Sequence, residues 1–256
     1  MNRLLVISAV CASVTTAFSQ TFNNETVNAA DDIYSAGNAG NPDGNQVSAY
    51  NLGPNPGILT FSSVTGDITL NSYGGMNNPD GVVYTGSYNG GTIGSGGGYS
   101  DNLSYGRLSG ITEPGGGGLV GVFESATSLL NPAPASLNYY VSGDSALTYS
   151  PLLDQVFLIG DGLTGNGTGS VQQFIVPTGA TKLFLGISDA YGFSGSYYHV
   201  SPGAYGDNFG NFTASFQVSS SVPDDSSSIG LSALALAALM LAGFCWKNRH
   251  VSIRVW

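Results

Sequence analysis

The sequence predicts an all-β body, an antiparallel β-sandwich of jelly-roll-like topology. Three observations support this fold class. Short segments rich in β-branched and aromatic residues are bounded by Gly, Pro, Asn or Asp, one of them alternates apolar with polar residues, and no segment between the two ends of the chain repeats apolar residues at the helical period of 3.6. The predicted strands are residues 59–64, 67–70, 118–123, 156–159, 171–176, 182–187 and 212–218.

The clearest of these strands is residues 212–218. Phe212, Ala214, Phe216 and Val218 alternate there with three polar residues. A strand that covers a core on one face and meets water on the other shows this period of two. We therefore expect these four side chains to be buried between two sheets.

Glycine-rich segments connect the predicted strands, and residues 94–98 and 115–118 are the densest of them. A phosphate-binding loop would end in Gly-Lys, a pair that does not occur in the chain, and the Gly-x-Gly-x-x-Gly spacings at 116–121 and 160–165 do not open a predicted helix. We expect these segments to be ordinary loops.

The first 19 residues have the organisation of a secretory signal peptide. Arg3 lies in a short leading region, residues 4–14 are mainly apolar, and residues 17–19 form a small-x-small cleavage site before Gln20. We expect signal peptidase to remove residues 1–19 and to leave a body of residues 20–221.

The other end of the chain, residues 222–256, predicts a membrane segment and a sorting signal. Residues 229–246 form an 18-residue, mainly apolar run followed by Lys247 and Arg249, which predicts a transmembrane helix with its basic end in the cytoplasm. Val222, Pro223 and Asp224, a serine-rich spacer, this helix and the basic end together resemble the PEP-CTERM sorting signals in their Val-Pro-Asp variant. The resemblance implies cleavage by an exosortase near Pro223. It implies export, a transient anchor in the inner membrane, and then the cell surface or the extracellular space.

Removal of both ends changes the composition of the body. Cys11 and Cys245 lie in the removed segments, which excludes disulfide and thiolate chemistry. Only Arg107 and Lys182 remain as bases against 14 carboxylates, a net charge near −12. Binding to nucleic acid requires clustered bases, so we expect no nucleic-acid partner. The charge is suited to cation binding or to solubility alone.

The residues also argue against an enzyme. His199 is the one histidine of the body, so a histidine zinc site cannot form, and no Gly-x-Ser-x-Gly motif is present. Paired carboxylates that meet only in space remain open. We expect a protein that is not a catalyst.

The segment from 183 to 212 suggests a calcium site. Asp189 ends a predicted strand, and Asp207 and Asn208 precede the next one, so three hard oxygen donors flank a glycine-containing loop. Calcium takes six to eight such oxygens in flexible geometry. A turn without an ion remains the alternative.

The run Pro-Gly-Ala-Tyr-Gly-Asp-Asn of residues 202–208 resembles the calcium and sugar loop of the PA-IL type galactophilic lectins, a calcium-dependent jelly-roll family. The resemblance implies five calcium ligands: Tyr73, Asp189, Ala204, Asp207 and Asn208. Ala204 stands where the family has threonine, which loses a side-chain contact. Asp207 replaces asparagine and adds charge.

The sugar contacts are less well preserved. Asn78-Pro79-Asp80-Gly81 corresponds to the His-Pro-Asp-Gln that touches galactose in the family, so Asn78 and Asp80 become candidate sugar-binding residues without galactose specificity. The loop after Asp189 adds two further candidates, Tyr191 and Tyr198. These tyrosines either stack on sugar rings or cover the open end of the sandwich.

Two hypotheses therefore remain. The first is a calcium-dependent module that binds an extracellular polysaccharide or glycan. The second is a non-catalytic structural protein of the cell surface or biofilm matrix with no sugar site. The sequence indicates neither the glycan nor the oligomeric state.

Overall fold

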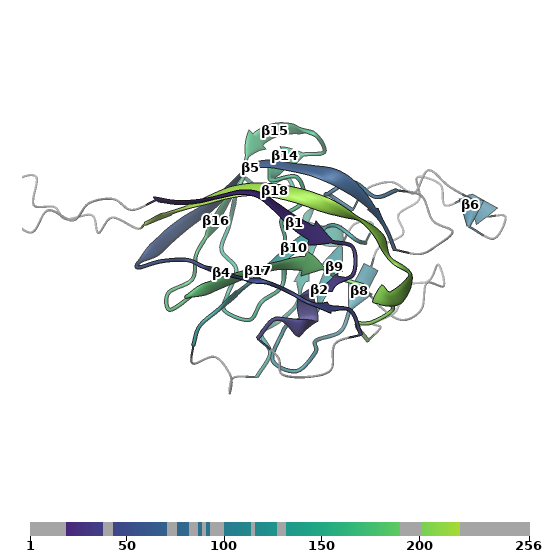
Figure 1. Cartoon of the computed structure of the whole chain (residues 1–256), viewed down its shortest axis with the longest axis horizontal. Coiled ribbons are helices and arrows are strands. Elements are labelled where there is room, and N and C mark those ends of the chain that lie inside the picture. Colours follow the sequence, from purple (N-terminus) through teal and green to yellow (C-terminus); the bar gives the residue numbers. More distant parts are fainter. Residues whose placement is uncertain are drawn as a thin grey trace, which may run out of the picture. The chain divides into compact units, whose positions relative to one another are not determined.

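The structure is a computed structural model of the whole chain (Figure 1). It describes residues 19–37, 43–70, 76–81, 87–88, 91–92, 100–113, 116–126, 132–189 and 201–220, all within the compact unit Ala17–Ser221. Among these residues no helix is long and apolar enough to cross a membrane. Of the predicted signal peptide only Ser19 is described, and the predicted sorting signal and its helix at 229–246 lie outside the described residues.

Two large sheets form the body, and Figure 1 shows them as two layers, with β1, β5 and β18 in one and β4 and β17 in the other. The strand order of the first sheet is β1 (Ser19–Asn28), β18 (Phe209–Ser220), β5 (Pro56–Thr69), β16 (Gln173–Ile175) and β12 (Thr148–Tyr149). The order of the second is β13 (Phe157–Leu158), β10 (Leu119–Glu124), β17 (Lys182–Ile187), β2 (Asp31–Asp32) and β3 (Asn45–Gln46), and β4 (Ala49–Asn51) also pairs with β17.

Smaller elements complete the described residues. A third sheet contains β11 (Leu137–Asn138), β9 (Ile111–Glu113) and β8 (Ser100–Asn102), and two pairs are formed by β14 (Leu163–Gly165) with β15 (Thr168–Val171) and by β6 (Ser87–Tyr88) with β7 (Gly91–Thr92). Helical turns are short: α1 (Tyr139–Ser142), η1 (Ile33–Ser35) and η3 (Tyr205–Asp207). The all-β prediction is confirmed.

The strand directions differ in part from the purely antiparallel prediction. The long ladders, β1 with β18, β18 with β5 and β10 with β17, are antiparallel. Four short ladders are parallel: β12 with β16, β17 with β2, β2 with β3, and β11 with β9. The sheets are therefore mixed.

Strand β17 covers the predicted range 182–187, whereas the predicted strands 59–64 and 67–70 are one continuous strand, β5. Gly66 explains the difference. Its φ is +105°, and a Cβ there would lie 2.3 Å from the Asn211 carbonyl oxygen of β18. The glycine thus permits a close approach between paired strands instead of a turn.

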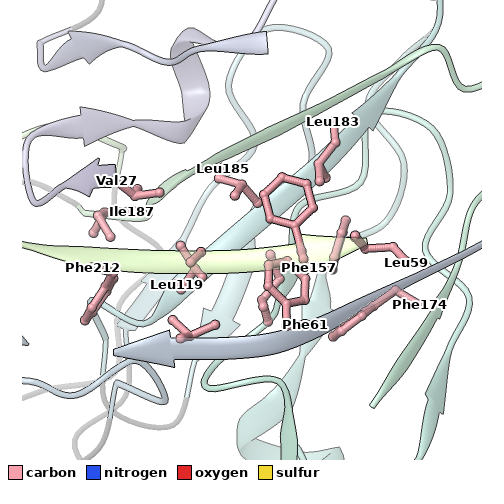
Figure 2. Close-up of a cluster of buried hydrophobic side chains, with 14 of the residues drawn as sticks. Val27, Leu59, Phe61, Leu119, Phe157, Phe174, Leu183, Leu185, Ile187 and Phe212 are labelled. Atoms are coloured by element: carbon pink, nitrogen blue, oxygen red, sulfur yellow. The ribbon is translucent and has the colours of Figure 1, made fainter. Parts of the chain in front are cut away.

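The main core lies between the two large sheets. Phe212, Ala214, Phe216 and Val218 are at most 1% exposed, which confirms the alternation expected for this strand. Figure 2 shows labelled side chains of both sheets pointing toward one another, with Phe157 at the centre of the cluster. Burial of each such side chain stabilises the fold by about 1.5–3 kcal/mol.

A second apolar cluster covers the other face of β10 and β17. Val120, Val122 and Phe184 pack there against residues that include Ile33 and Ile111. All six residues of β10 are consequently buried. Ser188 and Asp189, which directly follow β17, also lie inside the protein, and the candidate site is built around them.

Candidate functional site

The structure brings Asp189 into contact with the segment that precedes β18. Asp189 directly follows Ser188 at the end of β17 and is 4% exposed. The Gly203 N–H donates to the Asp189 carbonyl oxygen at 3.1 Å, and the Asp189 N–H donates to the Tyr205 hydroxyl at 3.1 Å. The Tyr205 hydroxyl in turn donates to the Ile187 carbonyl at 2.9 Å. Two predicted ligand regions on either side of one loop thus meet.

Ala204 and Asp207 are placed differently from Asp189. Ala204 has a left-handed backbone, φ +74°, and its N–H donates to Asp43 Oδ2 at 2.7 Å. Asp207 ends the short helix η3 and is exposed. The carboxylate of Asp207 is therefore at the surface, whereas that of Asp189 is inside.

Asn208 is 8% exposed and is held by the turn that follows β1. Its Nδ2 donates to the Ala29 carbonyl at 3.0 Å, and its Oδ1 is buried with no hydrogen-bond donor among the described residues. Tyr73, the fifth predicted ligand, lies outside the described residues, as do Tyr191, Tyr198, Val222, Pro223 and Asp224.

Glu113 is a buried acid that sequence reasoning missed. It ends β9 with 0% exposure, the Ser188 hydroxyl donates to its Oε1, and the Gly118 N–H donates to its Oε2 at 3.0 Å. The pKa of Glu113 is raised to about 7, mainly by burial and in smaller part by the charge of the neighbouring Asp189. The glycine run before β10 was the available signal, because it brings a backbone N–H to the carboxylate.

Both bases of the body lie away from this carboxylate pair. Arg107 is 8% exposed and forms ion pairs with Glu124 at 2.6 Å and with Asp154 at 3.4 Å. Lys182 stands opposite Glu124 in the ladder between β10 and β17. Neither Arg107 nor Lys182 is among the groups that shift the pKa of Glu113.

The predicted sugar contacts lie in a separate place. Asn78 is half-buried, and its Nδ2 donates to Asn166 Oδ1 at 2.7 Å. Asp80 is 4% exposed, and its Oδ1 accepts from the Asp161 N–H at 2.8 Å. Asp80 lines a narrow crevice whose empty space, with its mouth, is about 190 Å³. Asp80 is thus a recessed group and not part of an open face.

Neither place holds a complete metal-binding set of acidic side chains. Within the described ranges, no three His, Cys, Asp or Glu side chains gather closely enough to hold a metal ion. A cation at either place would rely on amide, carbonyl and water oxygens beside one or two carboxylates.

Comparisons with known proteins identify no relative. No family model matches the chain, and no curated protein or solved structure matches it. The proposals that follow are therefore supported by the described residues and by the motif resemblances alone.

Proposed function

We propose that this chain is an exported, non-catalytic bacterial surface or matrix protein whose jelly-roll-like β-sandwich binds a glycan through calcium. Signal peptidase and an exosortase process its two ends. The observation that carries the calcium proposal is the contact between buried Asp189 and residues 203–205, three residues before the buried Asn208.

Three features of this place favour a cation. Asp189 supplies a buried carboxylate. The Asn208 Oδ1 is a buried oxygen that no described donor satisfies. Such hard, partly desolvated oxygens are the donors that calcium prefers. Asp207 and Ala204 belong to the same short segment, and Tyr73 would add the carbonyl that the lectin resemblance implies.

The glycan would bind through the calcium ion. A calcium ion held mainly from one side keeps coordination positions open, which two sugar hydroxyls fill in the lectins that the motif resembles. Tyr191 and Tyr198 belong to the loop that follows Asp189 and would offer aromatic faces to a sugar ring. An extracellular polysaccharide is the partner of this chemistry.

A structural surface protein without a sugar site is the second candidate. It is favoured by the lack of a three-carboxylate metal set among the described residues. It is also favoured by the internal hydrogen bonds of Asp189 and Asn208, which serve the packing of β17, β18 and the chain near Ala29.

Calcium titration of the chelator-treated protein by calorimetry, followed by glycan-array binding with and without calcium, separates the two candidates. We expect calcium-dependent glycan binding that D189N abolishes. D67N, which removes an exposed charge from β5, is the matched control and should bind as wild type. Glycan binding that persists in chelator, or calcium binding unchanged by D189N, would exclude the first candidate.

A further inference from the structure

The Asp80 crevice contains a buried carboxylate whose hydrogen bonding is incomplete. Asp80 Oδ1 accepts the Asp161 N–H, whereas Oδ2 is buried and has no hydrogen-bond donor among the described residues. A buried carboxylate oxygen without a donor or counter-charge is costly, so an unsatisfied one indicates a missing partner.

Two further acids raise the pKa of Asp80. Burial is the main cause that raises its pKa to about 6, and the charges of Asp161 and Asp144 add to the rise. Asp161 keeps its position because its carboxylate accepts the Leu163 N–H at 2.8 Å and the Gly167 N–H at 2.6 Å. Negative charge therefore gathers at a place where the protein fixes its geometry.

Among the described residues, no base is placed to neutralise this charge. The two bases of the body are Arg107, which is ion-paired with Glu124 and Asp154, and Lys182, which faces Glu124. Neither is among the groups that influence Asp80. We therefore expect the counter-charge to come from solution, as a proton or as a cation.

The crevice has the lining that a small cation requires. Asp144 and Gln172 line it together with Asp80, and Tyr149 and Leu158 are among its other lining residues. Gln172 Nε2 donates to the Asp144 carbonyl at 2.5 Å, which fixes the loop that carries the second carboxylate.

Gly160 leaves room for the carboxylate of Asp80. Its φ is +62°, and a Cβ at this position would lie 2.3 Å from Asp80 Oδ1. Only a residue without a side chain lets Asp80 occupy its place, so the backbone after β13 is shaped around this acid.

We propose that the crevice binds a divalent cation with the chemistry of calcium, through Asp80 Oδ2 and the Asp144 carboxylate, with water completing the coordination. A hard cation suits two carboxylates, and two carboxylates with water agree with the lack of a three-acid set among the described residues. The site shares no residue with the one proposed at Asp189, and it does not depend on glycan binding.

The test is calorimetric titration of calcium chloride into the full chain, purified in a non-ionic detergent and stripped of metal, at pH 7.5. D80N replaces the acid by an amide of equal size that can still accept the Asp161 N–H. We expect D80N to lower the affinity of one class of sites by about tenfold or more, because even outer-shell groups contribute 10- to 100-fold. D144N should lower the calcium affinity of the same class of sites by a smaller factor, and D67N should leave that affinity unchanged.

The outcomes separate this site from the one at Asp189. Loss of one class of calcium sites in D80N and of another class in D189N supports both the crevice site and the site at Asp189. Loss only in D189N overturns the crevice site and leaves the proposed function standing. Loss only in D80N supports the crevice and excludes calcium at Asp189. If D80N does not fold, as judged by near-ultraviolet circular dichroism, D144N decides: a titration identical to wild type overturns the proposal.

Discussion

Glu113 and Asp80 are both buried acids, but their carboxylates differ in the number of hydrogen bonds that they accept. Glu113 receives a donor on each oxygen, from the Ser188 hydroxyl and from the Gly118 N–H. Asp80 receives one donor, from Asp161, and its second oxygen has none among the described residues. The difference indicates that Glu113 is a structural acid satisfied within the fold, whereas the second oxygen of Asp80 lacks the partner that the proposed cation would supply.

The largest effect is expected from removal of the satisfied acid. E113A leaves the Ser188 hydroxyl and the Gly118 N–H buried without an acceptor, which should lower the free energy of unfolding by about 2–4 kcal/mol. E113Q keeps an acceptor and should cost less. Urea denaturation measures both variants. A loss below about 1 kcal/mol in E113A would show that these two donors find other acceptors.

A methyl group at Gly160 should have the next largest effect. G160A combines a strained left-handed backbone, about 1–2 kcal/mol, with displacement of the Asp80 carboxylate. G167A is the matched control, because Gly167 has a similar φ of +67° and nothing within 4 Å of the added Cβ. Thermal and urea unfolding should separate the two variants. Equal losses would mean that the space beside Asp80 is not critical.

The pH dependence of stability should distinguish the two acids in wild type. Each has a folded pKa raised by burial, to about 6 for Asp80 and about 7 for Glu113, so the folded state holds its proton more tightly than the unfolded state. Stability should therefore fall, by an amount on the order of 2 kcal/mol, as the pH rises from about 4 to about 7, and level off above.

Variants and metal assign the two parts of this pH profile. D80N should remove the decrease that ends near pH 6, and E113Q the decrease that extends to about pH 7. Millimolar calcium should reduce the Asp80 part by stabilising its charged form, and should leave the Glu113 part in place. If calcium changes only the Glu113 part of the pH dependence of stability, then Glu113 and not Asp80 is the acid that responds to the cation.

The smallest effects concern charge removal in metal-free buffer. At pH 8, D80N removes a buried charge without a partner and should stabilise the protein by about 1 kcal/mol. D67N removes an exposed charge and should stay within about 0.5 kcal/mol of wild type. Differential scanning calorimetry with chelator measures both. Destabilisation in D80N would show that the carboxylate has a protein partner after all.

Local patterns made part of this fold predictable. Strand β17 and the buried face of residues 212–218 follow from apolar runs and from alternation along a few residues. Strand β1 has the polar sequence SQTFNNETVN, and pairing with β18 rather than its own pattern makes it a strand. Propensity alone could not have indicated it.

The candidate sites were predictable only where their residues are close in sequence or in a known motif. Asp189 and residues 203–205 meet because a single loop joins their strands. Ser188 reaches Glu113 across 75 residues, and the Asp161 N–H reaches Asp80 across 81. Contacts of this separation depend on the packing of both sheets, and a single sequence contains no local signal for them.

Strand β18 lies between β1 and β5 and pairs with both along its length. If a glycan is bound at the proposed site before Phe209 while the chain beyond Ser220 is tethered, a pulling force acts along β18 from one end to the other. The hydrogen bonds to its two neighbours then bear the load together in shear instead of opening one after another. The central strand would make this domain a mechanically strong link between a cell and its surroundings.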